Sequence, residues 1–239
     1  MLNELTDCER DGELRLVRDS KDASAPSEIR VITRDVNSSK ARALGGLPGV
    51  KLFEADSCNP SSLVEAFRDV QRVFVALPQA LPAEQMVSVG NGIADVAKAC
   101  GVKLIVRISS LGIDSMSTPF LEDQGPLGNS HVACEEHIKS IGLIVTSIRP
   151  TSFFTNFNYD LPGILQHSRF SSPLGKSAKV NWISLTDIGN VSARALTHHE
   201  WDGKVLDITG PAVGEGCENC LGAVDMQNLL TEVAEEMRG

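Results

Sequence analysis

The sequence predicts an α/β protein built on a doubly wound, mostly parallel β-sheet. From Glu28 onward, short apolar runs rich in β-branched residues alternate with segments of helical spacing. These runs are apolar without interruption, which is typical of strands that helices cover on both faces. Several helical segments stop at a glycine, the residue that most readily takes the conformation found just after a helix. We therefore expect right-handed connections and helices on both faces of the sheet.

The expected elements follow one another from Glu28. Asn59 and Pro60 open one of the helices, because asparagine is a favoured N-cap and proline fits the first helical position. The helix that ends before Gly101 carries apolar residues on one face, which predicts that this face packs on the sheet. The expected strands are 29–33, 50–55, 72–77, 103–109, 143–148 and 205–209, and the expected helices are 38–44, 60–67, 83–100 and 131–140.

The chain is organised around the stretch from Lys103 to Asn156, which reads strand, helix, strand. Two parallel strands joined by a helix form a βαβ unit, and sheets of this kind bind ligands beyond the carboxyl ends of their strands. Those ends are Ser109-Ser110 and Pro150-Thr151. The sequence therefore predicts the functional site at these two pairs of residues.

Composition narrows the class of protein. A chain of 239 residues that is 42% hydrophobic can bury one substantial core. Its formal net charge of -9 argues against a nucleic-acid-binding or anionic membrane-binding surface. We find no apolar run long enough to span a bilayer and no apolar core of a signal peptide, so we expect a cytoplasmic protein.

The six cysteines are interpreted as free thiols, as expected of a cytoplasmic chain. Cys217 and Cys220 form a CxxC pair, but zinc sites usually combine two such pairs. We therefore expect no metal site.

Seven motifs in order resemble the NmrA-like branch of the atypical short-chain dehydrogenases. Three lie in the central stretch: VRISSLGID, the spacing His131-xxx-Glu135, and GLIVTSIRPTSFFTNF. ITRDVNSSKARAL, GVKLFEADSCNPSSLVEAF and RVFVALP precede them, and WISLTDIGNVSARALTHHEWDGKVLDITGP follows. The resemblance covers about Glu28 to Pro211. It implies a Rossmann-like fold that binds NAD(P), with residues 28–239 as a single domain whose small C-terminal part covers the substrate.

The family begins with a strand and a glycine-rich turn that holds the dinucleotide pyrophosphate, together with a helix N-terminus. No glycine pair precedes Glu28, and residues 1–27 read as an irregular segment in which 13–17 could form a short strand. The first strand and its turn are thus missing or degenerate in this sequence. We therefore expect it to bind dinucleotide at least about a hundredfold more weakly than a chain that carries the turn.

The resemblance also assigns cofactor-binding residues. Arg34 ends a strand where the family meets the adenosine ribose, and an arginine there suits the 2′-phosphate of NADP(H). The alternative is an ordinary surface arginine. Asp56 matches an adenine-contacting position, or it caps the turn before Asn59. The remaining cofactor-binding positions are Leu77, Pro78, Ser110, His131, Pro150 and Thr151, the last two of which contact the nicotinamide carboxamide in the family.

Two residues are candidates for catalysis, Ser109 and His131. In standard short-chain dehydrogenases a serine at the position of Ser109 polarises the substrate carbonyl, while a Tyr-xxx-Lys pair donates the proton. This chain lacks that pair, and its one tyrosine, Tyr159, lies after the strand expected over 143–148. His131 could hydrogen-bond the nicotinamide ribose or donate a proton, or it could simply be a capped histidine. Glu135 could orient His131 or pair with Lys139.

Two functions remain open. The first is an NAD(P)H-dependent oxidoreductase acting on a small apolar metabolite, which the resemblance places in fungal secondary metabolism. Phe153, Phe154 and Phe157 would line its substrate site or belong to the core. The second is a non-catalytic sensor that regulates a partner protein and binds dinucleotide weakly or not at all. Neither function involves nucleic acid or a membrane, and the oligomeric state stays open.

Overall fold

The structure, a computed structural model, describes residues 28–77, 81–113, 126–157, 166, 179–210 and 221–222. The chain divides into two units, each described by itself below. The first comprises Met1–Arg149 and Thr186–Asp207, and the second comprises Pro150–Leu185 and Ile208–Gly239. The predicted irregular segment 1–27, with its possible strand, lies outside the described residues.

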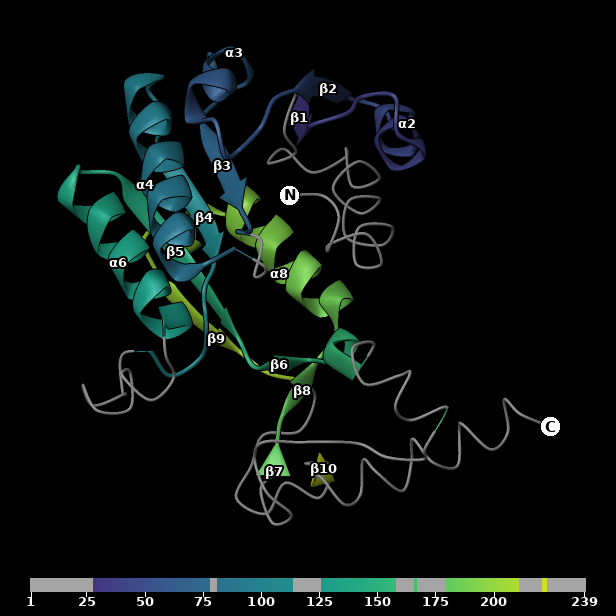
Figure 1. Cartoon of the computed structure of the whole chain (residues 1–239), viewed down its shortest axis with the longest axis vertical. Coiled ribbons are helices and arrows are strands. Elements are labelled where there is room, and N and C mark those ends of the chain that lie inside the picture. Colours follow the sequence, from purple (N-terminus) through teal and green to yellow (C-terminus); the bar gives the residue numbers. More distant parts are fainter. Residues whose placement is uncertain are drawn as a thin grey trace. The chain divides into compact units, whose positions relative to one another are not determined.

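A four-stranded parallel sheet forms the centre of the first unit (Figure 1). Its strands are β3 (Arg72–Val75), β4 (Leu104–Ile108), β5 (Ile144–Pro150) and β9 (Val205–Ile208), hydrogen-bonded in that order. Phe74, Val106 and Thr146 lie side by side across the first three strands, which fixes their register. A one-residue slip of a strand in this register would turn each of its side chains to the opposite face of the sheet, so the predicted apolar runs fit this register.

A second, two-stranded parallel sheet lies in the same unit. It joins β1 (Ile29–Thr33) to β2 (Val50–Glu54), and α2 (Ser39–Gly45) connects the two strands. Ser38 caps α2, because its side chain accepts a hydrogen bond from the Ala41 backbone N–H at 3.2 Å. Within the described residues, no strand pairs this sheet with β3.

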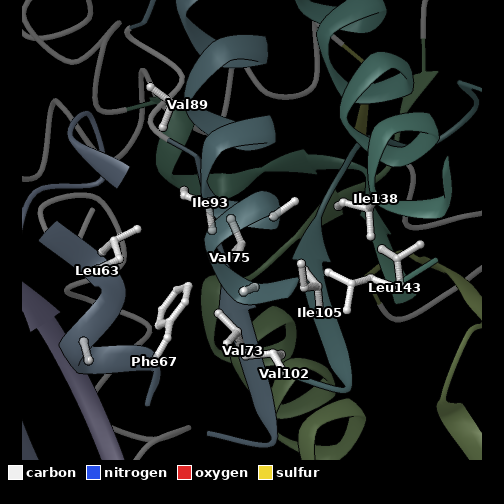
Figure 2. Close-up of a cluster of buried hydrophobic side chains, with 14 of the residues drawn as sticks. Leu63, Phe67, Val73, Val75, Val89, Ile93, Val102, Ile105, Ile138 and Leu143 are labelled. Carbon is white, nitrogen blue, oxygen red and sulfur yellow. The ribbon is translucent and has the colours of Figure 1, made fainter. Parts of the chain in front are cut away.

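The helices of the first unit lie on both faces of the larger sheet, as predicted (Figure 1). Ile105 and Val145 pack in the core with residues of α4 and α6 on one face, and Figure 2 shows this cluster. Thr146, one position later on β5, turns to the opposite face and donates to the Trp201 carbonyl. The helical elements are η1 (Pro60–Leu63), α3 (Val64–Phe67), α4 (Ala83–Ala99), α6 (Pro126–Ser140), α8 (Leu185–Thr197) and η3 (His199–Trp201).

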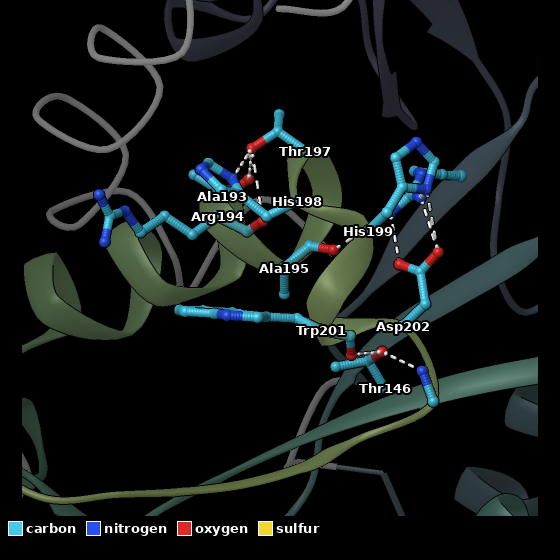
Figure 3. A network of polar contacts seen from close by, with 11 residues as sticks. Thr146, Ala193, Arg194, Ala195, Thr197, His198, His199, Trp201 and Asp202 are labelled. Carbon is cyan, nitrogen blue, oxygen red and sulfur yellow. Dashed lines mark hydrogen bonds and ion pairs between the residues drawn. The ribbon is translucent and has the colours of Figure 1, made fainter. Parts of the chain in front are cut away.

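An ion pair connects the beginning of β3 to the segment after α8 (Figure 3). The Arg72 guanidinium donates to both carboxylate oxygens of Asp202, at 2.7 and 2.8 Å, and His199 contacts the same two side chains. The Thr146 hydroxyl also accepts from the Gly203 backbone N–H at 3.0 Å. These contacts fix the far end of the sheet, opposite the carboxyl ends of its parallel strands.

Short strands make up the described part of the second unit. β6 (Ser152–Phe153) pairs in parallel with β8 (Trp182–Ile183), and η2 (Phe154–Asn156) follows β6. β7 (Lys179–Val180) pairs antiparallel with β10 (Leu221–Gly222). The sequence did not predict these strands, because two residues are too few to show a periodic pattern.

The predicted fold class is confirmed, and each predicted strand appears within two residues of its expected bounds. Two helices differ from prediction. The helix expected from His131 begins earlier, at Pro126. Proline is tolerated in the first turn of a helix, so it does not prevent this earlier start. The helix expected over 60–67 opens as a 3₁₀ turn, in which the Ser62 hydroxyl bonds the Asn59 carbonyl at 2.7 Å.

Close packing of α4 on α6 predicts the effect of Gly90→Ala. A Cβ at this buried glycine would lie 2.6 Å from the Cys134 sulfur, well inside van der Waals contact. We expect Gly90→Ala to lower the free energy of unfolding by about 1–3 kcal/mol, although alanine gains about 1 kcal/mol in helix propensity. Chemical denaturation measures the change.

Cys134→Ala provides the matched background for this experiment. It removes the sulfur and leaves Leu77 as the nearest neighbour of the added methyl group, at 3.1 Å. Gly90→Ala should then be close to neutral or slightly stabilising. An equal loss of stability in both backgrounds would contradict the proposed contact.

Candidate functional site

A layer of buried polar side chains separates β4 and β5 from α6 in the first unit. Successive residues of a strand point to opposite faces, so Arg107 and Ser109 share the face of Ile105, and Arg149 shares the face of Val145. The beginnings of these strands therefore place apolar side chains under α6, while their carboxyl ends place polar ones there. Arg107, Ser109 and Arg149 are all at most 5% exposed.

Glu135 of α6 is the centre of this polar layer. One carboxylate oxygen accepts from the Ser109 hydroxyl at 2.6 Å, and the other accepts from Arg149 Nη2 at 2.8 Å. Arg107 Nη1 lies 3.9 Å from the first of these oxygens. The carboxylate thus contacts side chains from both strands and satisfies buried donors that would otherwise have no anionic partner.

Arg107 also binds His131, one helical turn before Glu135. Its Nη1 donates to the His131 backbone carbonyl at 2.7 Å, and its Nη2 lies 3.1 Å from the ring nitrogen Nδ1. The first turns of α6 are therefore attached to β4 by one guanidinium. His131 is itself only 7% exposed.

Burial and charge set the protonation of this layer. Burial lowers the pKa of His131 to about 4, and the charge of Arg107 adds to the effect against an opposing contribution from Glu135. Burial alone raises the pKa of Glu135, but hydrogen bonds from Ser109 and Arg149 and the charges of both arginines lower it on balance. Burial also raises the pKa of the Cys134 thiol. At neutral pH the layer therefore holds an ionised Glu135 and a neutral His131.

These protonation states decide what the two candidate catalytic residues can do. The Ser109 hydroxyl gives its hydrogen to Glu135, so its oxygen is left as an acceptor. A neutral His131 is a poor proton donor, which favours the hydrogen-bonding role among those considered for it. Glu135 contacts Ser109 and Arg149, whereas the sequence suggested His131 or Lys139 as its partner.

The structure brings Ser109 and His131 into one network, and three other predicted residues of the same unit, Arg34, Asp56 and Leu77, lie outside its hydrogen bonds. Arg34 is exposed after β1. The Asp56 carboxylate accepts from the Cys58 backbone N–H at 2.9 Å, which is the turn-capping contact named as its alternative role. Leu77 borders a small cavity whose lining residues are Val75, Leu77, Gly90, Ile93, Ile105, Arg107, Cys134 and Ile138.

The structure describes three of the four remaining predicted residues. Ser110 directly follows Ser109 in the first unit and is half-buried, and Pro78 lies outside the described residues. Pro150 and Thr151 belong to the second unit, where the Thr151 backbone N–H donates to the Ile208 carbonyl at 3.1 Å. The Thr151 hydroxyl is buried and has no hydrogen-bond partner in the described structure.

Arg107 and Arg149 belong to the buried polar layer, but the sequence did not single them out. A signal for Arg107 was present, because it is the one charged residue in the apolar run Leu104–Ile108. A charge in a strand covered on both faces must be paired or lie at a functional site. Its partners lie more than twenty residues away in the sequence, so spacing alone could not identify them.

The second unit contributes an aromatic cluster. The Trp182 ring centroid lies 4.4 Å from that of Phe157 and 6.2 Å from that of Phe154. Phe154 is 45% exposed, and the Trp182 indole N–H is buried without an acceptor among the described residues. The cluster therefore combines an open aromatic surface with an unused hydrogen-bond donor.

The described residues contain no group of three or more metal-ligating side chains. Cys58, Cys100 and Cys134 are free thiols, whereas Cys217 and Cys220 lie outside the described residues. The described helices include none with the length and apolar character of a membrane span.

Relatives of the chain can be identified by sequence. The sequence profile of the NmrA-like family matches residues 15–213. Prestalk A differentiation protein A of Dictyostelium discoideum is 30% identical over 188 residues, which cover 77% of this chain and 55% of that protein. The NmrA-like family domain-containing oxidoreductase malD of Malbranchea aurantiaca is 28% identical over 178 residues, covering 66% and 52%. The chain thus spans about half the length of these curated relatives.

A solved structure shares the fold. The NADPH-dependent quinone oxidoreductase of Escherichia coli, complexed with NADPH, superposes with a TM-score of 0.76 at 21% identity. The match covers 98% of this chain and 74% of that one. It confirms the predicted Rossmann-like α/β fold.

The buried, neutral His131 predicts how stability depends on pH. Between about pH 6.5 and 4 the unfolded chain binds a proton at this residue that the folded chain does not. The free energy of unfolding should therefore fall by about 3 kcal/mol as the pH drops through this range. His131→Gln should remove this part of the slope, as measured by urea denaturation at several pH values.

His137→Gln is the matched control, because His137 lies on the same helix but contacts Asp95 at the surface. It should keep the part of the slope that His131→Gln removes. A slope that is the same in all three proteins would show that His131 is not buried in the neutral form.

Proposed function

The chain belongs to the NmrA-like family, and on this premise we propose that it is an NADP(H)-dependent oxidoreductase of small organic molecules. The observation that carries the proposal is the polar layer around Glu135, which holds Ser109 and His131 at the carboxyl ends of β4 and β5. Ligands of such sheets bind beyond those ends. A relative named as an oxidoreductase and a fold shared with an NADPH complex support the proposal.

Arg34 fits the cofactor, since an exposed guanidinium after β1 can form a bidentate pair with a phosphate. No ion pair among the described residues uses Arg34. Ser109, Ser110 and His131 offer polar groups near the strand ends for the nicotinamide half. When bound, NADPH supplies a hydride, and the protein orients the reacting groups.

The aromatic cluster of the second unit supports a flat, apolar substrate. Phe154, Phe157 and Trp182 offer ring faces on which such a molecule can stack. The narrower proposal, a metabolite of fungal secondary metabolism, rests on the family resemblance. The similarity to the oxidoreductase of Malbranchea aurantiaca adds support.

One observation favours a second candidate, a dinucleotide sensor without catalysis. Ser109 directs its hydrogen to Glu135, and His131 is neutral, so neither side chain is in a state to transfer a proton to a substrate at neutral pH. Spectrophotometric NADPH oxidation with a panel of aromatic quinones separates the candidates. Turnover supports the oxidoreductase, and NADPH binding without turnover of any acceptor supports the sensor.

Arg34 predicts the choice between nucleotides. The unmodified protein should bind NADPH more tightly than NADH, because only NADPH carries the 2′-phosphate. A charge-assisted pair contributes about 1.5–3 kcal/mol, so Arg34→Ala should weaken NADPH binding about 10- to 100-fold and leave NADH binding unchanged. Titration calorimetry measures all four affinities.

Arg68→Ala is the control, because Arg68 is an exposed arginine that pairs with Glu65. It should leave both affinities as they are. Equal affinity of the unmodified protein for the two nucleotides would refute the role given to Arg34.

A further inference from the structure

We propose that Arg107 is a positioning residue that holds His131 in its neutral form with the ring proton on Nε2. His131 then presents a constant hydrogen-bond donor to a carbonyl oxygen of the bound ligand. This inference deepens the proposed function and rests on it. Arg107 lies within the motif VRISSLGID, but the resemblance assigns no role to it.

The geometry of the guanidinium fixes the tautomer. Arg107 Nη2 lies 3.1 Å from Nδ1 of His131, while Nη1 of the same group donates to the His131 carbonyl at 2.7 Å. A guanidinium has five N–H donors and no acceptor. Nδ1 must therefore accept this hydrogen bond and cannot carry a proton. The proton of the neutral ring is then on Nε2.

Protonation of the ring is opposed by its surroundings. A proton on Nδ1 would face a guanidinium N–H, and the ring is 7% exposed. The charged groups that act on it are Arg107 on β4 and Glu135 on α6. Cys134 on α6 and Arg149 on β5 interact in turn with these two residues. Glu135 would favour an imidazolium, but its two oxygens already accept from Ser109 and Arg149. The lowered pKa of His131 agrees with this account.

The consequence is a division of roles between His131 and Ser109. The Nε2–H of His131 has no hydrogen-bond partner in the part of the chain that the structure describes. The Ser109 hydroxyl directs its hydrogen to Glu135 and can only accept from a ligand. His131 is thus the donor of the pair, and a carbonyl oxygen is the ligand group that it fits. This is the reverse of the sequence-based expectation, in which the serine polarises the carbonyl.

Nitrogen NMR of the histidine-labelled protein tests the tautomer directly. Two-bond proton–nitrogen correlations distinguish the two neutral tautomers and the imidazolium, and His131→Gln assigns the signal among the five histidines. We expect His131 to show the Nε2–H tautomer without titration between about pH 5 and 8. An Nδ1–H tautomer or an imidazolium at neutral pH in the unmodified protein would overturn the proposal.

Arg107→Met removes both donors and leaves Glu135 paired with Arg149, so the remaining buried charges balance. The His131 signal should then become a mixture of tautomers, and its pKa should move toward about 6.5. Arg68→Met, a change of an exposed arginine, should leave the His131 signal unaltered. A His131 signal unchanged in Arg107→Met would also overturn the proposal. The tautomer of the unmodified protein remains decisive if Arg107→Met does not fold.

Steady-state kinetics with NADPH and a carbonyl-containing acceptor, such as a quinone, test the role of His131 toward the ligand. In Arg107→Met, kcat should fall about tenfold and gain a pH dependence near the new His131 pKa. A kcat that neither falls nor gains this pH dependence would overturn the ligand role of His131. Calorimetry of the unmodified protein with NADPH tests the proposed function separately. If NADPH does not bind, the NMR experiment still tests the role of Arg107 independently.

Discussion

The single carboxylate of Glu135 is the constraint on which the carboxyl end of the larger sheet depends. Two buried guanidiniums, those of Arg107 and Arg149, lie on neighbouring strands and would repel one another without an anion between them. Removing one partner of a buried ion pair costs about 3–5 kcal/mol, because the charge left behind has no compensation. The Glu135 carboxylate compensates these charges and accepts two hydrogen bonds. One comes from Ser109, just after β4, and the other from Arg149 on β5.

The same arrangement divides α6 into two functional halves. His131, Glu135 and Ile138 recur at steps of four and three, so they share one face of the helix. Ile138 packs in the apolar core with Ile105, while the two earlier residues contact the polar strand ends. The apolar half stabilises the position of the helix, and the polar half fixes its rotation. A small shift of α6 would therefore break the contacts that orient His131.

Much of the fold could be predicted from the sequence, but the pairing of side chains within the candidate site could not. Apolar runs predicted the strands because burial on both faces leaves a clear local signal, and Ser109 and His131 followed from the strand end and the family motif. The partners of Glu135 depend on how β4 and β5 align and on how α6 is turned, and neither is a local property. Sequence spacing suggested His131 or Lys139, each four residues away, whereas the folded chain offers Ser109 and Arg149, which are 26 and 14 residues away.

The relation of β1 and β2 to the larger sheet depends on side chains. In the described residues no ladder of hydrogen bonds joins the two sheets. Phe53 of β2 instead packs against the core cluster that contains Phe67, and Arg30 of β1 donates to the Ala66 carbonyl at 3.1 Å. Close-packed contacts of this kind transmit position because protein interiors have few voids. The location of Arg34, which directly follows β1, is thus set by the same core that supports β3, and the proposed selection of NADPH by Arg34 would depend on that packing.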